Sequence, residues 1–302
     1  MINEIRGLDI KSLLSKEVYG CEIIGVGSEG CVHEFCHNVS EILRNSEKLK
    51  GNMRCIRIVT PRIPQMYMIQ IWQYIIRLSY NFEIDSIIIN DLGLLSKFNK
   101  QNELKFKIIL GRTLIRTLEY TPWHDCFTKN EMEDLVQINI LHTEKLEILK
   151  KCNVYGVEMC ATHNNINAMK MIQNAGLAVI TQYDNIIATI GRTCPVVRWL
   201  DEEVGKCNNL CSRSYKLEFV APGGVLLKDA EMKNKVAEIV PNLLCIGNVV
   251  YHKQNLDMNF PYYSSQGVIF DYRLSDFREI ENIRQRLAEK DSVGSSNSER
   301  IC

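Results

Sequence analysis

Ser86–Asn90 reads Ser-Ile-Ile-Ile-Asn, and this stretch decides the fold class because three consecutive isoleucines fit a strand that is buried on both faces. Similar apolar runs occur at residues 22–26, 55–60, 106–110, 154–159, 178–190 and 268–271, and the longest has room for more than one strand. Stretches with helical spacing lie at residues 35–49, 64–80, 129–151, 164–175 and 276–289. Alternating strands and helices indicate βαβ units and a parallel sheet. Six or seven such units predict an α/β fold, a TIM-like (β/α)8 barrel that is irregular or incomplete, with a doubly wound sheet as the alternative.

The composition limits the class of protein. Lys and Arg number 36 and Asp and Glu number 36, so the formal net charge is zero, which argues against a nucleic-acid binder that depends on a basic surface. Hydrophobic residues make up 46% of the 302 residues, so we expect one barrel domain over residues 1–290 and a disordered Ser-rich tail at 291–302. No apolar run approaches the roughly 18 residues of a membrane span. The first residues lack the apolar region of a secretory signal, so a cytoplasmic location is expected.

Twelve cysteines need an explanation in a chain expected in a reducing compartment, where disulfides do not persist. Three of them are close in sequence, with the spacing Cys194-x12-Cys207-x3-Cys211, after a strand run that ends near Ile190. Cys31 follows the first of the apolar runs through the loop Gly-Val-Gly-Ser-Glu-Gly. In a parallel barrel the residues just past each strand meet at one end. These four cysteines can therefore converge, and they are the predicted metal ligands.

Two kinds of metal group suit such a set. Structural zinc usually takes two tight cysteine pairs, and only Cys207 and Cys211 form one here. A 4Fe-4S cluster accepts four thiolates from separate segments, so the spacing favours the cluster and leaves zinc as the alternative. Cys36 could replace Cys31 as the fourth ligand, and His33 between them could be a ligand or a proton donor. The thiols could also be unrelated core residues, although the polar neighbours of Cys207 count against that.

The same region resembles a known family. The stretch Gly191-Arg192-Thr193-Cys194, followed by Cys207 and Cys211, resembles the cysteine signature of the collagenase-like peptidase family of unknown catalytic type, a U-type peptidase family, and most of all its UbiV-like branch of oxygen-independent ubiquinone-biosynthesis proteins. In that branch an N-terminal cysteine follows a strand and a Gly-Glu-like turn, as Cys31 does here. Three further landmarks occur in chain order: Asn90-Asp91-x-Gly93, Gly111–Leu114 and Val157-Glu158. The resemblance runs over roughly residues 20–290.

The resemblance implies a barrel-like fold, a 4Fe-4S cluster on four cysteines, and a second family member, similar to UbiU, as partner in a heterodimer. UbiV-like proteins work in hydroxylation without molecular oxygen. The chain is therefore expected to be an iron–sulfur oxidoreductase of that type, or a subunit of one, acting on a small-molecule or peptide substrate. Two alternatives stay open: a non-catalytic partner subunit with a structural cluster, and a peptidase. The His-Glu-x-x-His and Gly-x-Ser-x-Gly motifs are absent, but a cysteine peptidase is not excluded by sequence.

Several polar residues fall at or just after predicted strand ends, where the active sites of barrels lie. Glu158 and Asp91 are candidates for a general base. Arg112 and Arg192 could each hold a carboxylate through two parallel hydrogen bonds, and Asn90 could bind the same substrate. We therefore expect these side chains to face one cavity beside the cysteines.

Gly25, Gly27 and Gly30 follow a strand run with the spacing Gly-x-Gly-x-x-Gly, which is typical of dinucleotide-binding turns. That signature also needs an acidic residue at the end of a second strand, about 20 residues on. No such residue is clear in this chain, so a nucleotide site is disfavoured.

Overall fold

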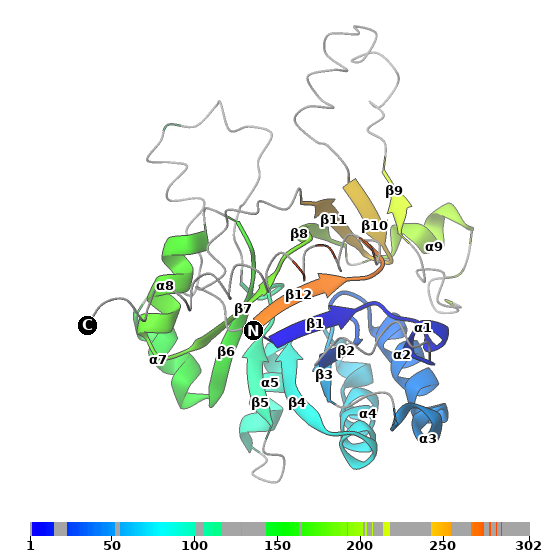
Figure 1. Cartoon of the computed structure of the whole chain (residues 1–302), viewed down its shortest axis with the longest axis horizontal. Coiled ribbons are helices and arrows are strands. Elements are labelled where there is room, and N and C mark those ends of the chain that lie inside the picture. The colour runs from blue at the N-terminus through cyan, green and yellow to red at the C-terminus, as the bar shows by residue number, and fades with distance from the viewer. Residues whose placement is uncertain are drawn as a thin grey trace, which may run out of the picture.

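The computed structural model is a closed barrel of eight parallel strands with helices around it (Figure 1). Neighbouring strands follow the order β1-β12-β7-β6-β5-β4-β3-β2, so the first and last strands pair and close the barrel. The barrel strands are β1 (Ile2–Arg6), β2 (Ile23–Gly27), β3 (Ile56–Val59), β4 (Ile84–Ile89), β5 (Lys107–Leu110), β6 (Val154–Cys160), β7 (Ala178–Gln182) and β12 (Gly267–Asp271). This topology confirms the predicted (β/α)8 type of barrel and excludes the doubly wound sheet.

The structure describes residues 2–14, 23–51, 55–100, 106–115, 128, 143–162, 165–191, 193–201, 203, 207, 214–217, 243–254, 267–274, 278, 282 and 285. The helices are α1 (Ile10–Leu14), α2 (Val32–Arg44), α3 (Ser46–Leu49), α4 (Met68–Asn81), α5 (Leu92–Lys100), α7 (Thr143–Lys151), α8 (Ile166–Asn174) and α9 (Pro195–Trp199), with a 3-10 helix η2 (Gln65–Tyr67) before α4. Predicted helical residues 129–142, most of 276–289, and the tail at 291–302 lie outside the described residues.

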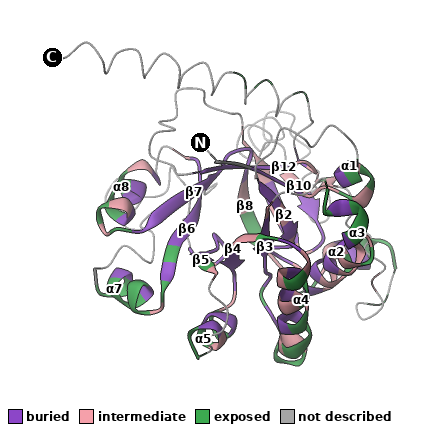
Figure 2. Cartoon of the chain, turned by 60° about the horizontal axis from the view of Figure 1, so that its bottom comes forward, coloured by how far each residue is buried: buried purple, intermediate pink, exposed green. Residues whose placement is uncertain are grey.

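The apolar core lies mainly between the strands and the surrounding helices. Along β4, Ile87 and Ile89 pack in the large cluster that includes the helices, whereas Ile88 belongs to a small cluster formed by strand residues alone. Both faces of this strand are therefore buried, which is why its sequence is continuously apolar. Figure 2 shows the barrel strands almost wholly buried, while the helices are buried along one side only.

Strand β1 is not among the strands that the apolar runs predict, because its inward side chains are charged. Ile5 packs in the cluster between strands and helices. Glu4 and Arg6 are buried, and the Arg6 side chain donates a hydrogen bond to the Glu4 carboxylate. The alternation still has the period of two expected of a strand, but charged residues occupy the buried inner positions.

A second sheet is inserted between barrel strands β7 and β12. Its strands pair antiparallel in the order β8 (Asn185–Ile190), β11 (Val249–Lys253), β10 (Leu243–Ile246) and β9 (Tyr215–Lys216). Strand β8 starts directly after β7, so the small sheet stands at the C-terminal end of the barrel strands (Figure 1). The predicted run at 178–190 is thus two strands of two different sheets.

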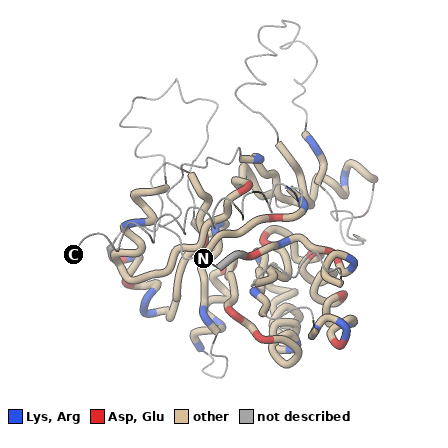
Figure 3. The backbone as a smooth tube through the Cα atoms, viewed as in Figure 1, with Lys and Arg blue, Asp and Glu red and all other residues tan. Residues whose placement is uncertain are grey.

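Positive and negative residues are mixed along the chain. Lys and Arg are interspersed with Asp and Glu along the described elements (Figure 3). Within the part of the chain that the structure describes, no helix has both the length and the apolar character needed to cross a bilayer.

Candidate functional site

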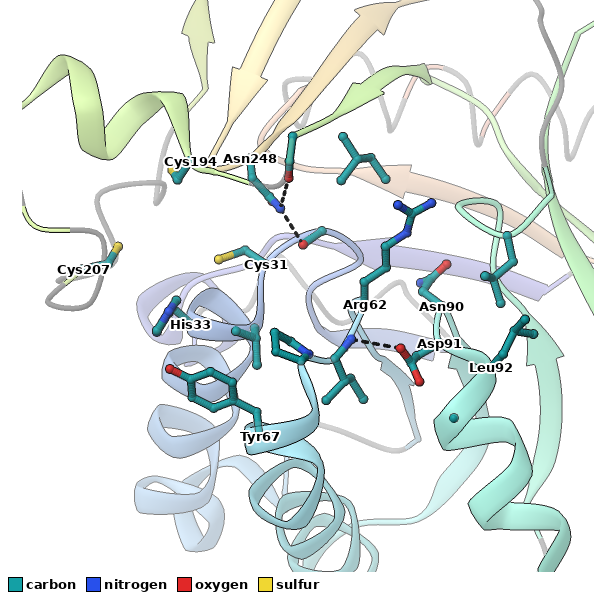
Figure 4. Close-up of a pocket in the computed structure, with 18 of the residues that line it drawn as sticks. Cys31, His33, Arg62, Tyr67, Asn90, Asp91, Leu92, Cys194, Cys207 and Asn248 are labelled. Carbon is teal, nitrogen blue, oxygen red and sulfur yellow. Dashed lines mark hydrogen bonds between the residues drawn. The ribbon is translucent and has the colours of Figure 1, made fainter.

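A cavity of about 680 Å³ opens at the C-terminal end of the barrel strands (Figure 4). Its walls come from the loops after β2 and β3, from the start of α5 after β4, and from the inserted segment around β8 and α9. This volume is typical of sites that bind small molecules. Much of the lining is apolar and includes Ile63, Pro64, Leu92, Leu114, Ile190 and Val197.

Cys31, Cys194 and Cys207 line this cavity together, and all three are half-buried. Cys31 precedes α2 and Cys194 precedes α9, so two of the thiols stand at helix N-termini. Figure 4 shows the three sulfur atoms gathered at one end of the cavity. Three of the four predicted ligands, which come from separate segments, thus line one cavity, and their binding of a metal stays a prediction. Cys211 and Arg192 lie outside the described residues.

The thiols influence one another electrostatically. Burial raises the pKa of the Cys31 thiol to about 11, and the Cys194 thiol adds a smaller contribution in the same direction. Burial also raises the pKa of Cys194, with a smaller contribution from Cys207. Thiols with raised pKa values are poor nucleophiles at neutral pH.

No group of three or more His, Cys, Asp or Glu side chains among the described residues is arranged to hold a single metal ion. Cys36 packs against the hydrophobic core and does not line the cavity, whereas Cys31 does. His33 lines the cavity and contacts Tyr67 edge-on, with 5.5 Å between the ring centroids.

Asn248, in the turn between β10 and β11, joins the two segments that carry Cys31 and Cys194. Its Nδ2 donates to the carbonyl of Gly30 at 2.8 Å and to the carbonyl of Gly191 at 3.1 Å. The main-chain carbonyl of Asn248 accepts a hydrogen bond from the Gly191 N–H at 2.7 Å. Asn248 of the inserted sheet thus links the loop that carries Cys31 to the segment that precedes Cys194.

The three glycines with dinucleotide-like spacing have separate steric reasons in this fold. A Cβ at Gly25 would lie 2.5 Å from the side chain of Arg6 inside the barrel. Gly27 has a φ of +119°, a conformation that residues with side chains rarely adopt. A Cβ at Gly30 would lie 2.0 Å from Val249 of the inserted sheet. The spacing therefore reflects packing of this barrel and agrees with the absence of the other dinucleotide landmark.

Asn90 and Asp91 line the cavity, as predicted, but their polar atoms bind other parts of the protein. Asn90 donates to the main chain just past β3 at 2.8 Å and accepts from the Thr113 hydroxyl at 2.6 Å. The two oxygens of Asp91 accept main-chain N–H groups of Leu94 at 3.0 Å and Ile63 at 3.2 Å. Both residues hold the loops of the cavity wall in position.

Arg112 and Glu158 lie inside the barrel and not on the cavity wall, which corrects the expectation that they face it. Glu158 is fully buried and accepts hydrogen bonds from Arg6 at 2.9 and 3.1 Å. Arg112 donates to both oxygens of Glu29, at 2.9 and 2.7 Å. Each side chain points inward because a residue of opposite charge binds it inside the barrel. Its position at a strand end does not indicate that partner.

These pairs belong to a network of buried charges in the barrel interior. Arg57 forms ion pairs with Glu4 and with Asp85 on the neighbouring strand. Burial by itself opposes ionisation of Asp271, but Arg273 holds the pKa of that carboxyl below its ordinary value through a charge interaction and hydrogen bonds at 2.9 and 2.7 Å. The interior arginines are thus each paired with carboxylates of the same chain.

Arg62 is a cavity residue that the sequence analysis does not single out. It lies just past β3, between Pro61 and Pro64, and its Nη2 donates to the carbonyl of Thr113 at 3.3 Å. Figure 4 shows its side chain extending between Asn248 and Asn90. The rule applied to the other candidates, a polar residue shortly after a strand end, would have found it.

No protein-family model matches the chain, and no curated protein matches it.

Proposed function

We propose that this barrel is an iron–sulfur protein that binds a small-molecule substrate in the cavity beside a 4Fe-4S cluster. The observation that carries the proposal is the meeting of Cys31, Cys194 and Cys207, from separate segments, at one end of that cavity. Cys211 would supply the fourth thiolate. It follows Cys207 by four residues, a distance of at most about 14 Å of extended chain, so it can reach the same place.

The chemistry that fits this arrangement is a redox modification of the substrate. A bound cluster supplies one-electron transfer next to the substrate. The residues of the chain would hold that cluster through thiolates, exclude water with the apolar wall, and exchange a proton through His33, which lines the cavity. Hydroxylation without molecular oxygen, together with a UbiU-like partner, is the form of this chemistry that the cysteine signature favours.

Anaerobic purification followed by iron, sulfide and zinc analysis tests the proposal. We expect about four iron and four sulfide per chain and broad visible absorbance. Cys31→Ala, Cys194→Ala and Cys207→Ala should each lose most of the iron and the colour. Cys36→Ala is the matched control, because Cys36 is also half-buried but packs against the core, and it should keep both.

Two results would contradict the proposal. Zinc in place of iron would favour the structural zinc alternative, and full iron and sulfide in both Cys31→Ala and Cys194→Ala would refute the ligand assignment. Reversible bleaching by dithionite and recovery with ferricyanide would support a redox role, whereas a cluster that neither reagent changes would favour the non-catalytic subunit.

A further inference from the structure

The polar groups of the cavity wall are mostly used within the protein, and Arg62 is different. Asn90 and Asp91 already bind the surrounding loops through both ends of their side chains. A guanidinium has five N–H donors. Within the described ranges, Arg62 uses one of them, on the carbonyl of Thr113, and takes part in no ion pair. Most of its donors are therefore unused by the part of the chain that the structure describes.

The charge around Arg62 favours a negative ligand. Asp91 is the carboxylate among the cavity-lining residues, and its two oxygens already accept main-chain N–H groups. The planar guanidinium binds carboxylate, sulfonate or phosphate oxygens through two parallel hydrogen bonds, which a hydroxyl or amide cannot match. A cavity with a partly unused guanidinium and a saturated carboxylate is therefore suited to an anion.

The remainder of the wall fits an apolar body. Leu114 and Ile190 line the cavity, and His33 and Tyr67 form an aromatic edge on another side. Leu92 on the wall is 64% exposed, so apolar surface also faces outward there. The volume of about 680 Å³ limits the ligand to the size of a metabolite and excludes a folded macromolecule.

We infer that the cavity binds a small organic anion with an apolar body, and that Arg62 holds its anionic group. In Figure 4 the three cysteines lie at one end of the lining residues and Arg62 lies between them and Asn90, so a ligand held by Arg62 can place its apolar body near the thiols. The inference rests on the proposed function in one respect: it takes the cavity as the substrate site.

A pair of fluorescent probes tests the inference on the full chain without any need for a cluster. Anilinonaphthalene sulfonate carries an anionic group on an apolar body, and phenylnaphthylamine is its neutral analogue. We expect Arg62→Ala to weaken binding of the sulfonate by about tenfold, the effect of losing one charged hydrogen-bonding group, and to leave the neutral probe unchanged. Arg62→Lys should fall between, because it keeps the charge but loses the fork.

Two further variants test whether the probes bind in the cavity. Leu114→Trp should weaken both probes by filling the cavity, with its folding checked by circular dichroism. Arg44→Ala should change neither probe, because Arg44 is exposed on α2 and pairs with Glu41. Competition by phenylpropionate against phenyl phosphate then distinguishes a carboxylate ligand from a phosphate ligand.

Equal sulfonate affinity of wild type and Arg62→Ala would overturn the inference, and so would unchanged binding in Leu114→Trp or displacement by neither competitor. A chain without iron that still binds the sulfonate through Arg62 would refute the proposed cluster while supporting the anion site, so the two failures are distinguishable.

Discussion

Arg6 inside the barrel and Arg62 in the cavity are both guanidinium groups, but their surroundings differ. Arg6 donates to Glu4 at 2.7 Å and to both oxygens of Glu158, and it is buried. Arg62 is exposed and, among the described residues, contacts a carbonyl alone. The interior arginines are paired with buried carboxylates of the same chain, so substitutions there should act on stability. Among the described residues, the cavity wall keeps most Arg62 donors unused and carries three thiols, as expected of a site that binds something from outside.

This comparison also predicts where mutations will act. Removing one partner of a buried ion pair leaves an uncompensated charge in the core, which is more costly than the pair is stabilising. A residue that faces a cavity and makes few internal contacts has little effect on folding. Interior variants should therefore lower stability, and cavity variants should lower binding.

The largest effect is expected for Glu158→Ala, which leaves Arg6 without its bidentate partner. We expect a loss of about 3–5 kcal/mol in the free energy of unfolding, measured by urea denaturation. The matched control is Glu41→Ala, which breaks the exposed pair with Arg44 and should cost under about 1 kcal/mol. Similar losses in the two variants would show that the interior network does not stabilise the barrel.

The next effect concerns Asp271, whose pKa is lowered in the folded state by Arg273. A carboxyl with a lowered folded pKa adds stability above its unfolded pKa, near 4, and loses it as the pH falls through the folded value. Wild type should therefore lose stability below about pH 4. Asp271→Asn should be less stable by roughly 1.5–3 kcal/mol at pH 7 and should depend less on pH between 5 and 3. Parallel pH profiles of the two proteins in urea denaturation would contradict this.

Asn248→Ala should have a smaller effect on stability, because it removes two side-chain hydrogen bonds to neutral carbonyls. We expect about 1–2 kcal/mol from their loss. Under the proposed function it should also lower iron content, since those bonds align the segments of Cys31 and Cys194. A variant that loses stability but keeps full iron would show that Asn248 supports the inserted sheet without positioning the ligands.

The smallest effect on stability is expected for Arg62→Ala. Because Arg62 is exposed and makes one internal hydrogen bond, its loss should change the free energy of unfolding by less than about 0.5 kcal/mol. Urea denaturation measures this directly. A loss of several kcal/mol would mean that Arg62 belongs with the interior arginines and would end the contrast between the two regions.

The barrel itself was predictable from local sequence. Runs such as Ile87-Ile88-Ile89 are apolar on both faces, and the alternation with amphipathic helices indicates a parallel sheet closed around a core. The position of Cys31 just past a strand also predicted its place at the cavity, because strand ends of a parallel barrel meet there. The strand runs and the place of Cys31 depend on the spacing of residues that are neighbours in the sequence, so they can be predicted from it.

Tertiary structure decided which of the polar residues at strand ends face the cavity and which are buried inside the barrel. Glu158 binds Arg6 inside the barrel, and the two residues are 152 positions apart in the sequence. Asn248 binds the loop before Cys31 at Gly30, which is 218 positions away. Strand β1 escapes prediction for the same reason, since its inward charges are satisfied by Arg57 and Glu158 on distant strands. A charge can be buried only where a partner compensates it. Sequence alone does not identify a distant partner, so it predicts such a residue to be exposed or catalytic. Local periodicity therefore indicated the fold class, whereas contacts between distant segments determined which charged side chains are buried and which line the cavity.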